Sequence, residues 1–176
     1  MSSKGEDMIK TRRLEIAEFK IDMAESVMLL SLDEDNKRFL PDEVFETREI
    51  AEAVILDLIE AYQSENGPFV YPILLNKKHI GHVELIQIDE GYEVGYHIGK
   101  EFCGHGYATE ALIGFLNHIS ESKKMDKVYG ICDSKNVASQ KVLIKAGFVL
   151  EYEGMGKYHG SVTPICRYKK VFKSDF

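Results

Sequence analysis

The order of hydrophobic and polar positions along the chain predicts a mixture of helices and strands. Apolar residues recur with the spacing of one helix face over 47–62 and 106–121. Asp22 and Thr47 are the expected caps of the first two helices. Short apolar runs bounded by turn residues predict strands. The predicted helices are 22–31, 47–62, 106–121 and 136–146, and the predicted strands are 8–19, 68–75, 80–88, 92–98, 127–132, 148–153 and 163–172.

The order of these elements predicts how the sheet is built. Three consecutive strands between 68 and 98 are joined by short turns, which favours an antiparallel meander. The strand–helix–strand unit over 92–132 favours one parallel pair with a right-handed crossover. We therefore expect a single mixed α/β domain over residues 1–176.

Composition excludes several classes of protein. Of the 176 residues, 44 % are hydrophobic and 29 % are charged, as in ordinary folded domains. A net charge of −7 argues against a nucleic-acid partner. No apolar stretch approaches the ~20 residues of a membrane span, and no secretory signal precedes the first strand. The three cysteines form no Cys-x-x-Cys pair. We expect a cytoplasmic protein without a membrane partner.

The charge is unevenly distributed along the chain. Residues 1–90 hold 10 Lys and Arg against 20 Asp and Glu, whereas residues 91–176 hold 12 against 9. A polyanionic ligand would prefer the second half, and a cationic ligand the first.

The most informative segment is 91–116, GYEVGYHIGKEFCGHGYATEALIGFL. A strand is expected to end at Gly99, a glycine-containing loop follows, and a helix begins near Gly106. The free N–H groups at a helix start attract anions, and glycines let a phosphate approach the backbone. No Gly-Lys-Ser/Thr follows, so the loop is not that of a P-loop nucleotide-binding protein.

Two motifs carry a resemblance to a known family. Residues 103–108 resemble the acyl-CoA-binding motif of the GCN5-related N-acetyltransferases (GNAT), Gln/Arg-x-x-Gly-x-Gly/Ala, with Cys103 in place of the usual Gln or Arg. Residues 136–148 resemble the Asn-x-x-Ser/Ala…Lys-x-Gly-Phe segment of the same family. The sequence of residues 95–112 is similar to that of the subgroup that contains the ribosomal-protein N-terminal acetyltransferases (RimJ/RimL type).

The resemblance implies a mostly antiparallel sheet with helices on both faces, and acetyl-CoA as co-substrate. It implies that strand 92–98 splays away from strand 127–132, and that the pantetheine arm lies in this gap. The pyrophosphate would bind backbone N–H groups of the glycine loop. The residues expected to bind acetyl-CoA are Ile98, Gly99, Cys103, Gly104, His105, Gly106, Tyr107, Ala108, Thr109, Asn136 and Ser139.

The expected reaction is attack of a neutral primary amine on the thioester, which needs a proton acceptor and no metal. Glu93 is the first candidate for this base and Glu84 the second, with proton loss through water left open. Many relatives carry a tyrosine near position 143 that protonates the leaving thiolate, and this chain has Leu143. Ser139 is the expected substitute.

Several alternatives remain at the level of sequence. A non-catalytic acyl-CoA-binding or regulatory module would keep the glycine loop without turnover. Cys103 and His105 suggest a thiol nucleophile, whereas His79 and His82 lack a partner at ligand spacing, so no metal is expected. The acceptor is expected to be a small-molecule amine or a protein N-terminus, and the protein a monomer or a homodimer that pairs through a strand edge near 163–172.

Overall fold

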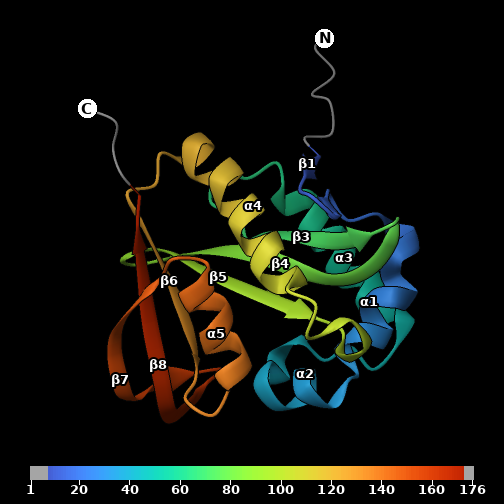
Figure 1. The fold of residues 1–176 in the computed structure, drawn as a ribbon. Helices are drawn as coiled ribbons and strands as arrows, with labels where there is room; N and C mark the ends of the chain where they lie inside the picture. The colour runs from blue at the N-terminus through green and yellow to red at the C-terminus, as the bar shows by residue number, and fades with distance from the viewer. Residues whose placement is uncertain (1–7, 173–176) are drawn as a thin grey trace.

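In the computed structural model, residues 8–172 are described, and their strands form one open sheet in the order β1-β2-β3-β4-β5-β6-β8-β7 (Figure 1). Neighbouring strands are antiparallel except β5 and β6, which are parallel. The predicted mixed α/β class and the mostly antiparallel sheet are confirmed. The strands are β1 (Ile9–Lys10), β2 (Leu14–Ile16), β3 (Phe69–Leu75), β4 (Lys78–Ile88), β5 (Gly91–Ile98), β6 (Lys127–Asp133), β7 (Val149–Tyr158) and β8 (Ser161–Val171).

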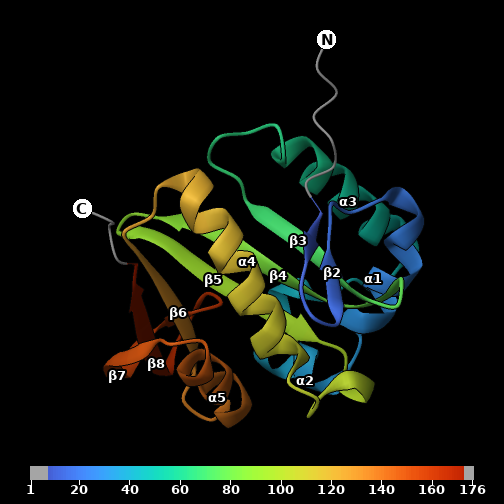
Figure 2. The same ribbon diagram turned by 45° about the horizontal axis from the view of Figure 1, so that its top comes forward.

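Helices cover both faces of the sheet, as the resemblance implies. Helices α4 and α5 lie on one face, and α1 and α3 lie on the other (Figure 2). Among the described residues, no helix is long and apolar enough to cross a membrane. The α-helices are α1 (Ala24–Ser31), α2 (Glu34–Phe39), α3 (Arg48–Ala61), α4 (Tyr107–Lys123) and α5 (Val137–Lys145).

Each face of the sheet has its own apolar core. The larger core packs the buried side of α4, including Leu112 and Phe115, against Val83 and Leu85 of β4. The smaller core joins α1 and α3 near Phe19. Because side chains alternate along a strand, β4 and β5 present one set of residues to each core. The sheet therefore separates two apolar cores.

The parallel pair is open over most of its length. Strands β5 and β6 pair only at Glu93 with Tyr129 and at Val94 with Gly130. Beyond Val94 the ladder ends, so the last residues of β5 face a gap. This is the splayed pair that the resemblance implies.

The first 40 residues differ most from the prediction. The single strand expected over 8–19 is wrong, because the hydroxyl and N–H of Thr11 bond to Leu14 and close a tight β1–β2 turn. Asp22 does not cap α1, which follows a short 3-10 turn at Ile21–Met23. Thr47 does cap α3, since its hydroxyl accepts from the N–H of Ile50.

Helix α2 and the following 3-10 turn, Pro41–Glu43, were not predicted. Their sequence is polar and carries no apolar periodicity. The Asp33 side chain caps α2 by accepting from the N–H of Asn36 at 2.7 Å. The buried Asn36 amide then donates to the carbonyls of Ser31 and Glu43, both at 2.9 Å. Side-chain hydrogen bonds, rather than apolar spacing, determine this segment.

The strand edge expected near 163–172 is wrong. Strand β8 pairs with β6 on one side and β7 on the other, so it lies inside the sheet. Its residues Ile165, Cys166 and Tyr168 are buried accordingly. The outer strand at this end is β7, and the hairpin is longer than predicted.

Candidate active site

The loop before α4 forms a backbone cradle. Gly104 and Gly106 have φ of +80° and +79°, in the left-handed region that favours glycine. Gly106 stands at the N-cap of α4, and no side chain caps the helix. A Cβ on Gly104 would meet no atom within 4 Å. The first N–H groups of α4 are therefore exposed to an incoming anion.

This cradle opens onto a groove of about 400 Å³ between the end of β5 and helix α5. The gap between β5 and β6 forms part of it, since Gly95, Tyr96 and Ile131 are among its walls. Tyr158, at the end of β7, lines its far side. The expected acetyl-CoA-binding residues that line the groove are Ile98, Cys103, Gly104, Gly106, Tyr107, Ala108, Thr109, Asn136 and Ser139.

Two expected binding residues lie outside this lining. The N–H of Gly99 donates to the carbonyl of Ile80 at 2.8 Å, which holds it toward β4. His105 Nδ1 donates to the carbonyl of Cys103 at 2.9 Å, and its ring stacks on Tyr107 with centroids 5.5 Å apart. His105 therefore braces the loop instead of facing the groove.

The hydrogen bond of Gly99 also orients its neighbour. In an antiparallel pair, successive residues direct their N–H and C=O groups to opposite sides of the strand. Since Gly99 points to β4, the N–H of Ile98 points to the gap. The structure thus presents one backbone donor where the strands separate.

Three cationic side chains near the cradle, Arg13, Lys141 and Lys145, were not predicted from the sequence as binding residues. The Arg13 guanidinium lies over the Tyr107 ring, 4.5 Å from its centroid, and pairs with Glu110 at 2.7 Å. Lys141 and Lys145 of α5 line the groove. The excess of positive charge after residue 90 signals the two lysines, but Arg13 comes from the β1–β2 turn and is brought there by the fold.

Ser139 belongs to a hydroxyl pair in the groove. Its Oγ lies 2.9 Å from Tyr96 Oη, which also donates to the Ser139 carbonyl at 2.9 Å. Burial raises the pKa of Tyr96 above its usual range, so the phenol remains protonated. The Asn136 side chain accepts from the N–H of Ser139 at 3.1 Å and caps α5. The sequence indicated Ser139 but not its partner Tyr96.

Glu84 and Glu93, the two candidate bases, project from the face of the sheet opposite to that of the Tyr96 side chain. Burial is the largest cause that raises the pKa of Glu84 to about 7, and the nearby Glu43 adds to it. Burial also raises the pKa of Glu93 to about 7, against the opposing effect of His159 and Arg167. Each carboxyl thus titrates near neutral pH, as a general base should.

Their positions differ. Glu84 lies opposite Gly95 in the β4–β5 ladder, and a Cβ on Gly95 would overlap its carboxylate. Since Gly95 lines the groove, the Glu84 carboxylate lies beside the gap. Glu93 lies where β5 and β6 still pair and lines neither the groove nor the cavity described next.

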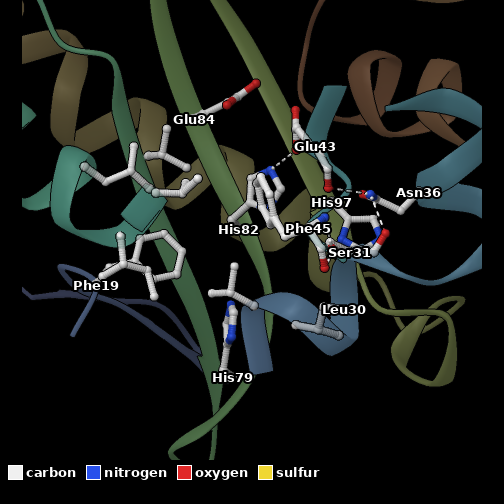
Figure 3. Close-up of a pocket in the computed structure, with 15 residues that line it drawn as sticks. Phe19, Leu30, Ser31, Asn36, Glu43, Phe45, His79, His82, Glu84 and His97 are labelled. Carbon is white, nitrogen blue, oxygen red and sulfur yellow. Dashed lines mark hydrogen bonds and ion pairs between the residues drawn. The ribbon is translucent and has the colours of Figure 1, made fainter. Parts of the chain in front are cut away.

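A second hollow, a cavity of about 130 Å³, lies under α1 and α3 on the face where Glu84 projects (Figure 3). His97 lines both the cavity and the groove. It pairs with Asp33 at 3.1 Å, and His82 pairs with Glu43 at the same distance. These two contacts join the polar 33–43 segment to β4 and β5, which the sequence did not indicate.

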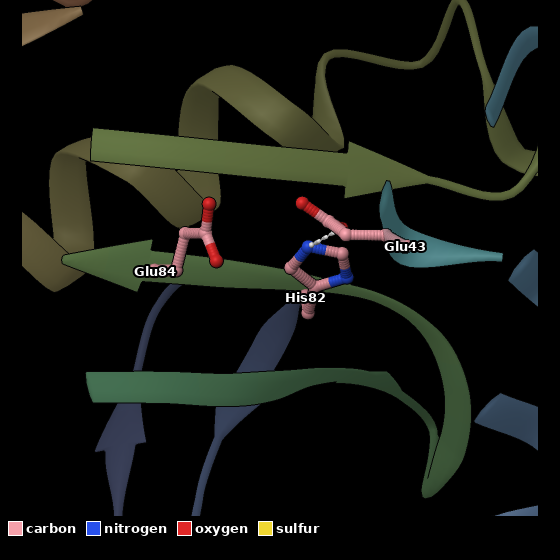
Figure 4. Close-up of side chains that lie close together, drawn as sticks. All are labelled: Glu43, His82 and Glu84. Atoms are coloured by element: carbon pink, nitrogen blue, oxygen red, sulfur yellow. Dashed lines mark ion pairs between the residues drawn. The ribbon is translucent and has the colours of Figure 1, made fainter. Parts of the chain in front are cut away.

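Glu43, His82 and Glu84 form a compact cluster whose candidate ligand atoms lie within 4.8 Å of one another (Figure 4). Burial opposes protonation of His82, but the Glu43 carboxylate outweighs it and raises the pKa of His82. A protonated imidazole donates to a carboxylate and does not ligate a metal. The cluster therefore fits an ion pair beside a titrating carboxyl better than a metal centre, although three ligand types are present.

The thiol-nucleophile alternative finds no support in the loop geometry. The Cys103 thiol donates to the Ile98 carbonyl at 3.4 Å, whereas His105 bonds to backbone. Burial, with Asp33 and Asp35, raises the pKa of Cys103, which disfavours the reactive thiolate.

Known proteins share this fold. Residues 13–149 match the acetyltransferase (GNAT) domain family. A relative from Bacillus subtilis strain 168, described as an uncharacterized N-acetyltransferase (YnaD), is 26 % identical over 143 residues, covering 79 % of this chain and 81 % of the relative. The chain belongs to the acetyltransferase (GNAT) domain family, and the protein is an N-acetyltransferase.

Two solved structures illustrate the likeness of fold. The ribosomal L7/L12 alpha-N-protein acetyltransferase RimL, in complex with coenzyme A, superposes with a TM-score of 0.80 at 20 % identity, over 94 % of this chain and 98 % of that one. The microcin C7 self-immunity acetyltransferase MccE, in complex with acetyl-CoA and AMP, gives a TM-score of 0.78 at 21 % identity, over 92 % and 93 %.

Proposed function

We propose that this protein transfers the acetyl group of acetyl-CoA to a primary amine by direct attack on the thioester. The observation that carries the proposal is the continuity of the site. The glycine cradle opens onto a groove, and the groove reaches a strand gap beside which the Glu84 carboxylate lies. The coenzyme A and acetyl-CoA complexes of RimL and MccE support the choice of donor.

In this proposal the donor is held mainly by backbone and cations. The pyrophosphate accepts hydrogen bonds from the first N–H groups of α4. Arg13, Lys141 and Lys145 add positive charge around it. The pantetheine arm follows the groove to the gap, where the N–H of Ile98 donates to the thioester oxygen and stabilises the developing oxyanion.

The reaction involves two proton transfers, one on each face of the sheet. The amine reaches the gap from the side of α1 and α3, and Glu84 accepts its proton as the C–N bond forms. The tetrahedral intermediate then collapses with cleavage of the C–S bond. The thiolate of CoA leaves as the C–S bond breaks and takes a proton from the hydroxyl pair of Ser139 and Tyr96, and solvent returns that proton to the pair. Glu93 remains the rival base.

The first experiment measures donor binding. Thermal unfolding is followed with and without acetyl-CoA, where ligand at 100 times its Kd adds about 2.7 kcal/mol of stability. Gly104→Trp places a large side chain in the cradle and should abolish the shift. Gly91→Trp is the matched control, because Gly91 also has positive φ and open space but lies at the β4–β5 turn.

The second experiment measures turnover as release of the CoA thiol in a panel of primary amines. Turnover with any amine supports the enzyme. Donor binding without turnover of small amines or N-terminal peptides would instead favour the non-catalytic acyl-CoA-binding module.

A further inference from the structure

The cavity under α1 and α3 has two chemically different ends (Figure 3). One end is formed by Glu84, Glu43, His82 and His97. The other end is mostly apolar, with walls from the 19–31 segment, Phe45, α3 and β3, and it includes the ring of His79, whose buried Nε2 has no partner among the described residues. Its apolar lining is Phe19, Val27, Leu30, Phe45, Val54, Ile55, Leu58 and Val70.

At the first end, the Glu84 carboxylate lacks a donor within the described part of the chain. Among residues 8–172, no group donates a hydrogen bond to the Glu84 carboxylate, although Glu84 is only partly accessible. A buried carboxylate without a donor is unfavourable, and an ammonium or amine N–H would satisfy it. The N–H donors of the acceptor amine are therefore expected at this end, next to the strand gap.

The apolar end offers no place for a second charge. Of the acids near the cavity, Glu43 is paired with His82, and Asp33 is bonded to His97 and does not line the cavity. His79 lines the cavity, and burial lowers its pKa to about 4, so it is neutral at pH 7. A second ammonium, as in a polyamine, would enter without a free counter-ion and lose its hydration.

We propose that the acceptor is a primary amine on a compact, uncharged apolar body, and that this body fills the cavity while the amine meets Glu84. The inference rests on the proposed function and specifies its substrate class. An apolar cavity of about 150 Å³ accommodates benzene, so one of about 130 Å³ suits a phenyl ring or a branched chain of similar size.

The test compares initial rates at saturating acetyl-CoA. Phenylethylamine and 3-methylbutylamine are the apolar amines, ethanolamine the polar one and 1,4-diaminobutane the dication. Each buried methylene is worth about fourfold in kcat/KM, so the apolar amines should exceed ethanolamine and the diamine at least tenfold. A short peptide with an N-terminal phenylalanine is a further arm. Its preference over phenylethylamine would assign the apolar amine to a protein N-terminus.

A cavity-filling variant localises the effect. Val54→Phe on α3 should lower kcat/KM for phenylethylamine at least tenfold and leave that for ethanolamine within threefold. Leu56→Phe is the matched control, since Leu56 lies on the same helix but is 57 % exposed. Val54→Leu, a smaller enlargement, replaces Val54→Phe if the latter unfolds. Equal rates for all amines, preference for the diamine, or identical profiles of Val54→Phe and Leu56→Phe would overturn the inference.

Failure of the proposed function has a different signature. If no amine turns over, binding of phenylethylamine is measured directly by calorimetry. Binding to the wild type and to Leu56→Phe, but not to Val54→Phe, would support the cavity as an amine site without the reaction. Absence of binding to the wild type would refute the inference itself.

Discussion

The Glu84 carboxylate occupies the space over β5 that a Cβ on Gly95 would fill. The two residues face each other across the antiparallel β4–β5 ladder, with β5 forming one wall of the strand gap. A glycine at position 95 thus lets a buried acid lie beside the groove. The proposed proton acceptor depends on the absence of a side chain on its neighbour.

Gly95→Ala should therefore impair catalysis more than donor binding, because the added Cβ points toward Glu84 although Gly95 lines the groove. The added methyl displaces Glu84 from the gap, and we expect kcat to fall at least tenfold because proton transfer is sensitive to position. The acetyl-CoA-dependent shift in Tm should be unchanged. In a Glu84→Gln background the same substitution should add less than threefold, and a full additional loss would show that Gly95 acts by another route.

Replacing each carboxylate separately ranks the two candidate bases. Glu84→Gln should lower kcat by on the order of 10²-fold, the usual contribution of a general base. Glu93→Gln should cost less than threefold, because Glu93 lies where β5 and β6 still pair. Steady-state kinetics of both variants decide the point, and the reverse ranking would assign the proton acceptor to Glu93.

The pH dependence of kcat in the wild type should follow the ionisation of Glu84. Glu84 accepts a proton only when it is ionised, so kcat should rise with pH through about 7, its pKa in the folded protein. The rise should disappear in Glu84→Gln. A flat profile in the wild type, measured from pH 5.5 to 8.5, would contradict the assignment.

The raised pKa also makes Glu84 costly to stability at high pH. The folded state binds this proton more tightly than the unfolded state, whose carboxyl has a pKa of 4.5. The resulting stability is present below pH 4.5 and is lost as pH rises through about 7. Glu84→Gln mimics the protonated form, so it should stabilise the protein on the order of 2 kcal/mol at pH 8 and change it little at pH 4.

Chemical denaturation at both pH values measures this difference. Glu49→Gln, at an exposed position of α3, controls for loss of a carboxylate from the acidic half of the chain. Equal stability of wild type and Glu84→Gln at pH 8 would indicate that Glu84 is better solvated than the fold suggests.

Cys103 should be dispensable for the chemistry. Its thiol donates to the carbonyls of Ile98 and Gly99 and has a raised pKa. Cys103→Ser preserves a donor at this position, and we expect kcat within threefold of the wild type. A decrease in kcat of more than about 10³-fold, measured as CoA release, would instead support Cys103 as a nucleophile.

Removal of metal should leave activity unchanged. Glu43 favours the protonated form of His82, which is a donor and not a ligand. Protein dialysed against EDTA should keep its turnover. A tenfold loss that Zn²⁺ restores would instead assign a divalent cation to the Glu43–His82–Glu84 cluster.

Features that depend on neighbouring residues could be predicted from the sequence. Helix α4 follows from the spacing of its apolar residues, and the cradle follows from glycines placed directly before it. Thr47 caps α3 through a bond to a residue three positions away. Motifs of this kind, together with the order of elements, indicated the sheet class and the family. The β1–β2 turn and α2 escaped because side-chain hydrogen bonds, and not periodicity, define them.

The sequence by itself determined the order of the elements from β3 onward, the glycine loop before α4 and the two candidate acids. Only the tertiary structure decided that Arg13 from the β1–β2 turn stacks on Tyr107, that Glu43 pairs with His82, and that Glu84 lies over Gly95. The physical reason is the distance along the sequence between the residues that interact. Hydrogen bonding within a turn and apolar spacing within a helix act over a few residues, whereas strand register and cavity lining depend on packing between segments far apart in the chain.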